Sequence, residues 1–174
     1  MRNLYKILMF GLTGELKLSS IYPLVDSNFK KTGIMYAIGA EFLVRNYYFQ
    51  DRHIVLQIVD LGPYDSVSKF VSKFSMGSKG AIGLYDTTDI ASLDDIAPFF
   101  TPIRTAVPNI PIILIGSKFK DINSSEIDTE YVTEIAEINK AEFFFTPMLT
   151  QNTFNKYLEL LIQMMDEFDS INPA

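Results

Sequence analysis

The segment from Lys6 to Ser20 has the outline of a phosphate-binding loop, but two of the residues such a loop requires are replaced. A working loop reads G-x-x-x-x-G-K-[ST] between a strand and a helix. Its backbone amides surround the phosphates, its lysine neutralises them, and its hydroxyl binds Mg²⁺. Gly11 and Lys17 stand at the correct spacing, whereas Leu16 replaces the second glycine and Leu18 replaces the hydroxyl residue. The pattern indicates a nucleotide-binding loop whose chemistry has changed.

The composition predicts a single globular domain over residues 1–174. A net charge of −6 and a pI near 4.7 argue against nucleic acid as a partner, because nucleic acid requires a basic face. The absence of cysteine excludes a disulfide framework and a thiolate metal site. Since no signal peptide, spanning segment or lipidation motif is recognisable, we expect a cytoplasmic protein without an intrinsic membrane anchor.

Apolar runs of strand length alternate with segments of helical periodicity, which predicts an α/β fold. Six strands are expected, at residues 4–10, 40–49, 54–60, 80–85, 110–115 and 142–146. Five helices are expected, at residues 16–22, 66–76, 92–107, 125–139 and 151–168. The polar pair Gln50-Asp51 lies between two strand-like runs and predicts an antiparallel hairpin.

Four stretches resemble the Ras superfamily of small GTPases, and in particular its Rab-like branch. They are A-I-G-A-E-F (37–42), L-Q-I-V-D (56–60), G-L-Y-D-T-T-D (83–89) and P-N-I-P-I-I-L-I-G-S-K (108–118). The resemblance runs from Tyr5 to about Met165. It implies a three-layer Ras-like G-domain whose six-stranded sheet is mostly parallel, with one antiparallel hairpin strand.

The Mg²⁺ ligands that the resemblance implies are missing. The family binds the ion through a Ser or Thr in the loop and a Thr in the first switch segment, and these places hold Leu18 and Ala37. Neither side chain carries the oxygen that a hard cation demands. We therefore expect no metal.

The second switch motif, D-x-x-G-Q in the family, appears as Asp60-Leu61-Gly62-Pro63-Tyr64. The resemblance implies that the glycine amide contacts the γ-phosphate and that the glutamine orients the attacking water. Pro63 has no N–H to donate, and Tyr64 lacks the paired donor and acceptor of an amide. If the alignment to the family were shifted by one residue, Gly62 would take the place of the family's glycine. The downstream match at Tyr85-Asp86 would then be lost. No catalytic residue is predicted.

The base-specificity motif N-K-x-D appears as Ser117-Lys118-Phe119-Lys120, so a donor-only lysine stands where guanine needs an acceptor. A one-residue bulge could instead bring Asp121 into that place. The supporting S-A-K motif has become Pro147-Met148-Leu149.

Several residues of the nucleotide-binding pattern survive, namely Gly11, Gly14, Lys17, Asp60 and Lys118. With Asp121 they would form the nucleotide site if GTP or GDP is still bound. The favoured interpretation is structural: the glycines permit the turn after the first strand, Lys17 is solvated or pairs with Asp60, and Lys118 spans the loop as a structural strut.

A hydrophobic triad contacts effectors in Rab-like proteins, and its positions here hold Phe42, Val59 and Phe74, with Ile38 and Tyr64 nearby. These residues could form a partner-binding surface that is retained although the nucleotide site is lost. They could equally be core residues between the hairpin and the second helix. Elsewhere, Asp94 and Asp95 fall near a predicted helix start, where they would complement the helix dipole.

The sequence therefore predicts a pseudo-GTPase that acts through protein–protein interaction, with no cofactor. Its partner would be an effector or regulator, or another G-domain. The alternative is a divergent small GTPase that still binds guanine nucleotide and hydrolyses it slowly. A third hypothesis is nucleotide binding without turnover and without Mg²⁺.

Overall fold

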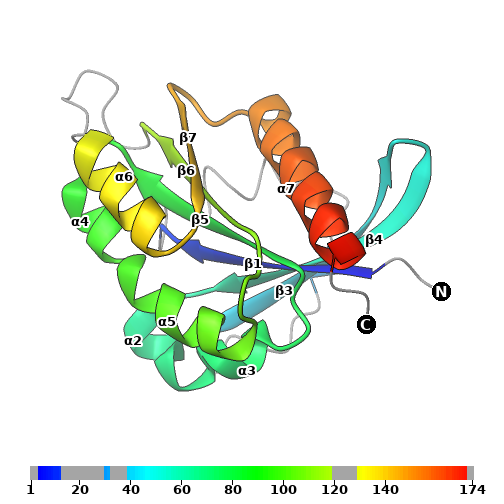
Figure 1. Cartoon of the computed structure of the whole chain (residues 1–174), viewed down its shortest axis with the longest axis horizontal. Helices are drawn as coiled ribbons and strands as arrows, with labels where there is room; N and C mark the ends of the chain where they lie inside the picture. Colours follow the sequence, from blue (N-terminus) through cyan, green and yellow to red (C-terminus); the bar gives the residue numbers. More distant parts are fainter. Residues whose placement is uncertain (1–3, 13–29, 32–38, 119–128, 172–174) are drawn as a thin grey trace.

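A single twisted sheet forms the centre of the protein in the computed structural model, which describes residues 4–12, 30–31, 39–118 and 129–171 (Figure 1). The strands follow the order β2-β3-β4-β1-β5-β6-β7. Their bounds are β1 (Leu4–Gly11), β2 (Lys30–Lys31), β3 (Ala40–Phe49), β4 (Arg52–Leu61), β5 (Gly80–Asp86), β6 (Ile112–Ser117) and β7 (Glu142–Thr146). All six predicted strands are present, and the two-residue strand β2 is added beside β3.

Helices cover both faces of this sheet, which makes three layers (Figure 1). They are α2 (Tyr64–Val67), the 3₁₀ helix η2 (Ser68–Phe70), α3 (Val71–Ser75), α4 (Ile90–Asp94), α5 (Ala97–Ala106), α6 (Thr129–Ile138) and α7 (Gln151–Ile171). The long helix α7 packs on one face, and residues of α3, α5 and α6 share a second core on the other. The predicted α/β class and mostly parallel sheet are confirmed.

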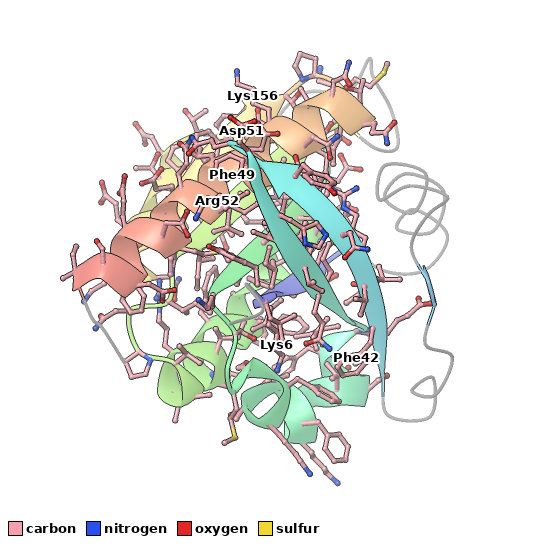
Figure 2. All side chains as sticks on the ribbon, turned by 90° about the vertical axis from the view of Figure 1, so that its right-hand side faces the viewer. Lys6, Phe42, Phe49, Asp51, Arg52 and Lys156 are labelled. Carbon is pink, nitrogen blue, oxygen red and sulfur yellow. The ribbon has the colours of Figure 1, made fainter. Side chains whose placement is uncertain are left out.

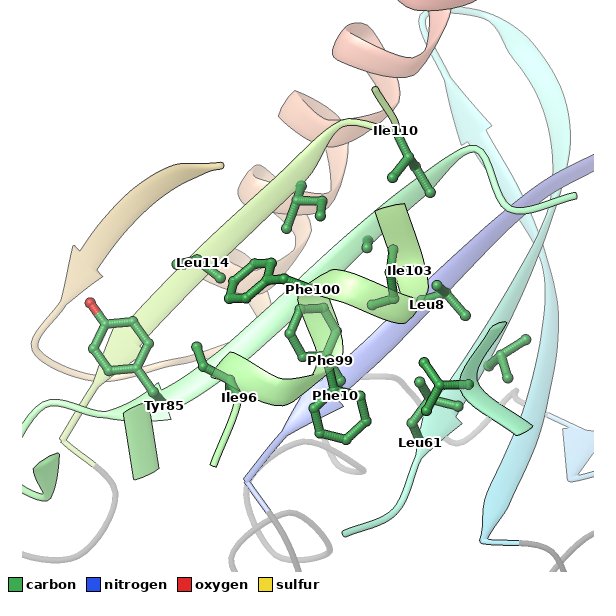
Figure 3. Close-up of a cluster of buried hydrophobic side chains, with 14 of the residues drawn as sticks. Leu8, Phe10, Leu61, Tyr85, Ile96, Phe99, Phe100, Ile103, Ile110 and Leu114 are labelled. Carbon is green, nitrogen blue, oxygen red and sulfur yellow. The ribbon is translucent and has the colours of Figure 1, made fainter. Parts of the chain in front are cut away.

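The central strand β1 has parallel neighbours on both sides, β4 and β5. Its side chains alternate between the two cores: Ile7 joins the core under α7, whereas Leu8 and Phe10 join the opposite one. Phe10 packs against Phe99 and Phe100 of α5, with ring centroids 5.2 and 5.8 Å apart (Figure 3). A strand buried on both faces explains the continuous apolar run in the sequence.

The predicted hairpin is confirmed. Strands β3 and β4 pair antiparallel from Ala40↔Leu61 to Phe49↔Arg52, and the two residues between them form the turn. Gln50 and Asp51 have φ of 46° and 62°. Positive φ at both central residues is the conformation of the two-residue turn that matches the twist of the flanking strands.

The helix predicted at residues 92–107 is two helices. Helix α4 ends at Asp94, and α5 begins at Ala97 with a proline in its first two positions. Pro98 has no N–H to bond the carbonyl of Asp94, and its ring crowds that carbonyl, which favours a break at this point. Pro102 lacks an N–H in the same way but lies inside α5 without ending it. Proline is well tolerated in the first turn of a helix, where the missing N–H has no partner to lose.

Other boundaries differ from the sequence prediction by a few residues. The helix predicted at 66–76 begins at Tyr64, directly after Pro63, and is interrupted by η2, where serine hydroxyls can compete for backbone hydrogen bonds. Strand β6 begins at Ile112 rather than at residue 110, because Pro111 cannot donate to a neighbouring strand. Helix α6 is described from Thr129, and the helix predicted at 16–22 lies outside the described residues.

A polar network connects the hairpin and β1 to α7. Asp166 of α7 accepts hydrogen bonds from Tyr5 and Arg52, both at 2.5 Å. Figure 2 shows Arg52 beside Phe49, close to α7, and its guanidinium lies 5.5 Å from that ring. Burial opposes ionisation of Asp166, but the hydrogen bonds from Arg52 and Tyr5 outweigh burial and lower its pKa.

We expect Asp166→Asn to lower the melting temperature by about 2–4 °C at pH 7, which corresponds to about 1 kcal/mol for a partly exposed ion pair in a domain of this size. Because the folded-state pKa lies below the unfolded one, this stabilisation is present above about pH 4 and is lost as the pH falls through the folded-state pKa. Circular dichroism melts between pH 7 and pH 3 would show the two proteins converging in acid.

The matched control is Asp169→Asn. Asp169 lies on the same helix as Asp166, and its substitution removes an ion pair with Lys79. Its carboxylate is 45% exposed against 30% for Asp166, so its effect should be smaller. A difference between wild type and Asp166→Asn that stays constant over this pH range would contradict the account of Asp166.

Candidate functional site

The predicted nucleotide-binding residues converge on one edge of the sheet. Strands β4, β1, β5 and β6 are mutually parallel, so their carboxyl ends meet at this edge. Gly11 ends β1, Asp60 lies one residue before the end of β4, and Lys118 directly follows β6. Ligands of open α/β sheets bind at such an edge. The remaining predicted positions lie outside the described residues; they are Gly14, Leu16, Lys17, Leu18, Ala37, Ile38, Lys120 and Asp121.

Gly11 is required by close packing. Its φ is +81°, and a Cβ there would lie 2.2 Å from the carbonyl oxygen of Leu84 and 2.5 Å from Ile96 Cγ2. The next residue, Leu12, is buried and donates its amide to the same Leu84 carbonyl at 3.2 Å. The structure therefore gives Gly11 a role in the turn that is independent of any phosphate.

The second switch segment offers no free amide at its two critical positions. The Gly62 amide donates to the Gly39 carbonyl at 2.7 Å. Pro63 has no N–H, and its own carbonyl accepts the amides of Ser66 and Val67 at the start of α2. The alternative register, in which Gly62 would contact a γ-phosphate, therefore meets an amide that is already bonded.

Tyr64, at the position of the family's glutamine, packs against the protein. Its ring lies 5.1 Å from the Phe99 ring in an edge-to-face arrangement. The two rings line a cavity of about 180 Å³, which also contacts Gly11 and Pro63. Typical pockets for small-molecule ligands are about 300–1,000 Å³, so this space is small for such a ligand. Tyr64 thus belongs to the packing between α2 and α5.

Two buried polar side chains at the ends of β5 and β6 have unused hydrogen-bonding atoms. Asp86 pairs with Ser117 across these parallel strands, so both project to the same face, and both are fully buried. Asp86 Oδ1 accepts from the amide and hydroxyl of Thr88, at 3.0 and 2.6 Å. Among the described residues, Asp86 Oδ2 and Ser117 Oγ have no hydrogen-bond partner. They could bond a water molecule or a polar ligand.

The sequence analysis did not single out Asp86 as a site residue. The sequence feature that could have identified Asp86 is its position at the end of the apolar run G-L-Y-D, where a carboxylate follows a buried parallel strand. Ser117 was noted only as a replacement for asparagine, and its short side chain explains why Oγ reaches no partner. Tyr85, on the opposite face, is also buried, and burial raises the pKa of its hydroxyl.

The predicted partner-binding triad is divided between core and surface. Val59 is fully buried and Phe74 is 7% exposed. Phe42, opposite Val59 in the hairpin, is half-buried and packs edge-to-face on Phe74 with ring centroids 5.9 Å apart. Burial favours the core alternative at Val59 and Phe74, whereas Phe42 and Tyr64 are partly accessible to a partner.

The carboxylates of Asp94 and Asp95 do not cap a helix. Helix α4 is capped by Asp89, which accepts from the Ala91 amide at 3.1 Å, and α5 has no side-chain cap. Asp94 instead accepts a hydrogen bond from the Tyr131 hydroxyl at 2.6 Å, which connects α4 to α6. Helix α4 begins at Ile90, so Asp94 is its last residue and Asp95 is its C-cap residue.

No cluster of three or more histidine, aspartate or glutamate side chains in the described segments could hold a metal ion. In that same part of the chain, no helix has the length and apolarity needed to cross a membrane.

Comparison with known proteins identifies the class. The family model described as "Ras family" matches residues 6–167, and the chain therefore belongs to the Ras family of small GTPases. It is similar to Ras-related protein Rab-3A of Homo sapiens, with 25% identity over 98% of this chain and 80% of the relative. It is also similar to Ras-related protein Rab-4B of Rattus norvegicus, with 28% identity over 96% of this chain and 79% of the relative.

We expect Gly11→Ala to destabilise the protein by at least about 3 kcal/mol, because the added methyl group meets backbone atoms and the residue must keep a positive φ. The melting temperature should fall by roughly 6–12 °C, measured by calorimetry. Gly77→Ala is the matched control: its φ is +73°, but nothing lies within 4 Å of an added Cβ. It should cost only about 1 kcal/mol. Equal losses in the two variants would refute close packing as the reason for Gly11.

Proposed function

We propose that this Ras-family protein is a pseudo-GTPase: it does not hydrolyse GTP, and it acts in the cytoplasm by binding other proteins. Its partners would be an effector, a regulator or a second G-domain. On this proposal, the function requires no metal and no nucleotide.

The observation that carries the proposal is the hydrogen bonding of residues 62 and 63. A γ-phosphate is sensed in this family fold by a backbone amide of the second switch. Here the Gly62 amide is bonded to Gly39, and Pro63 has none. A ligand that makes no differential contact with two states cannot shift a protein between them. The sequence changes at Leu18 and Ala37 act in the same direction, since they remove two hydroxyl ligands for Mg²⁺.

The alternative is a divergent small GTPase that retains guanine nucleotide. Gly11, Asp60 and Lys118 still meet at the carboxyl edge of the sheet, and Asp86 Oδ2 and Ser117 Oγ are unused there. This arrangement would suit nucleotide binding without turnover better than hydrolysis, because water orientation by a glutamine amide is missing at Tyr64.

We expect the melting temperature of the native protein to be unchanged by GTP, GDP or ATP, with Mg²⁺ or with EDTA. A ligand present at 100 times its dissociation constant would add about 2.7 kcal/mol, which is readily measured by differential scanning fluorimetry. A rise of several degrees with GTP or GDP that depends on Mg²⁺ would overturn the proposal. A rise that does not depend on Mg²⁺ would establish the nucleotide-binding alternative without turnover.

We expect Phe42→Ala to reduce binding of protein partners at least tenfold while lowering stability only modestly, because the ring is half-buried. Partners retained from an extract of the source cells can be quantified by mass spectrometry. Tyr48→Ala is the matched control, since Tyr48 lies on the same strand and is 75% exposed. Retention that is the same for Phe42→Ala, Tyr48→Ala and wild type would remove Phe42 from the recognition surface.

A further inference from the structure

The helices after the second switch carry a surface that is both apolar and basic. Phe70 and Met76 are 37% and 65% exposed, and the side chains of Lys69 and Lys73 are also exposed. We call these four residues the η2–α3 surface. Single exposed apolar side chains are ordinary on soluble proteins, so their meaning depends on what lies beside them.

The η2–α3 surface is continuous with the proposed recognition surface. The Phe70 ring lies 6.2 Å from Phe74, and Phe74 lies 5.9 Å from Phe42, so three rings form a row from η2 to β3. Figure 2 shows Phe42 at the end of the hairpin beside these helices, while the hairpin turn at Asp51 lies at the opposite end. A partner bound at Phe42 would therefore extend naturally over Phe70.

The charge of this surface is opposite to that of the whole chain. The protein has a net charge of −6, whereas residues 64–85 contain three lysines and one acidic residue, the exposed Asp65. One of them, Lys79, is paired with Asp169 of α7. In the described part of the chain no carboxylate pairs with Lys69 or Lys73. Two lysines beside two apolar side chains favour an occupant that is acidic and carries an apolar anchor.

Resting on the proposed function, we propose that the η2–α3 surface binds an acidic segment of a partner protein. The segment places an apolar side chain against Phe70 and Met76, and its carboxylates lie against Lys69 and Lys73. The partner recognised at Phe42 is thereby defined by its chemistry as an acidic protein.

An anionic membrane fits the surface less well than an acidic segment. Each basic residue near a membrane contributes about 1 kcal/mol, and stable attachment takes more than two such residues. A protein segment can contact the four residues alone, and charges beyond about 8 Å are screened at physiological salt.

The test uses the full chain with p-benzoylphenylalanine in place of Phe70, irradiated in an extract of the source cells. The same photocrosslinker in place of Tyr48 is the positional control, because Tyr48 is an exposed aromatic residue on the hairpin. Crosslinked peptides are sequenced by mass spectrometry. Lys69→Glu with Lys73→Glu is then compared with Lys156→Glu, an exposed lysine of α7 far from Phe42 (Figure 2).

We expect position 70, and not position 48, to capture a peptide rich in aspartate and glutamate that includes an apolar residue. The yield should fall about tenfold in the double variant and stay unchanged in Lys156→Glu. The inference would be overturned if the captured segment is neutral or basic. It would also be overturned if the crosslinking yield is the same in the double variant as in wild type, or if positions 70 and 48 capture the same peptides. So would a lysine-dependent sedimentation with vesicles of phosphatidylcholine and phosphatidylserine in the absence of an acidic crosslink.

The result is separable from a failure of the proposed function. A Mg²⁺-dependent stabilisation by GTP would reject the pseudo-GTPase, whatever position 70 captures. Loss of partners in Phe42→Ala together with a basic segment captured at position 70 would keep protein recognition and reject the acidic partner.

Discussion

The burial of β1 between two parallel neighbours is the constraint on which the rest of the molecule depends. Ile7 and Leu8 point into different cores. The Phe10 ring packs against two rings of α5, tilted on Phe99 and edge-to-face on Phe100. The strand then ends so close to Leu84 that only glycine fits at position 11. This packing fixes the carboxyl edge of the sheet, where the family places its nucleotide, without any contribution from a ligand.

The same edge shows which parts of the ancestral chemistry depend on packing and which depend on function. Gly11 persists because a methyl group would collide with the neighbouring strand. On the proposed function, Pro63 and Tyr64 stand where the family contacts phosphate and water, and both are compatible with the start of α2. Asp86 and Ser117 each keep a buried polar atom without a hydrogen-bond partner in the described part of the chain, a cost that a packed interior normally avoids.

Much of this architecture could be predicted from sequence patterns, because a buried parallel strand and a two-residue hairpin leave strong local signals. The six strands and the turn at Gln50-Asp51 were such cases. The rule for proline is local, but it does not settle where the helix divides, because α5 begins before Pro98 and continues through Pro102. The burial of Val59 and Phe74 could not be predicted, because their periodicity is the same whether a partner or the protein's own α3 covers them. The exposure of Phe70 likewise depends on tertiary packing, which no short sequence window contains.

The hydrogen bond from Gly62 to Gly39 joins the second switch segment to the residue that precedes β3. On the proposed function, a recognition surface braced in this way presents the same face before and after any encounter. Its occupancy then follows the abundance of the two proteins and their affinity, as for any simple association equilibrium. A cell could regulate such a protein through synthesis, degradation or competition for the partner, but not through the timed hydrolysis of a bound nucleotide.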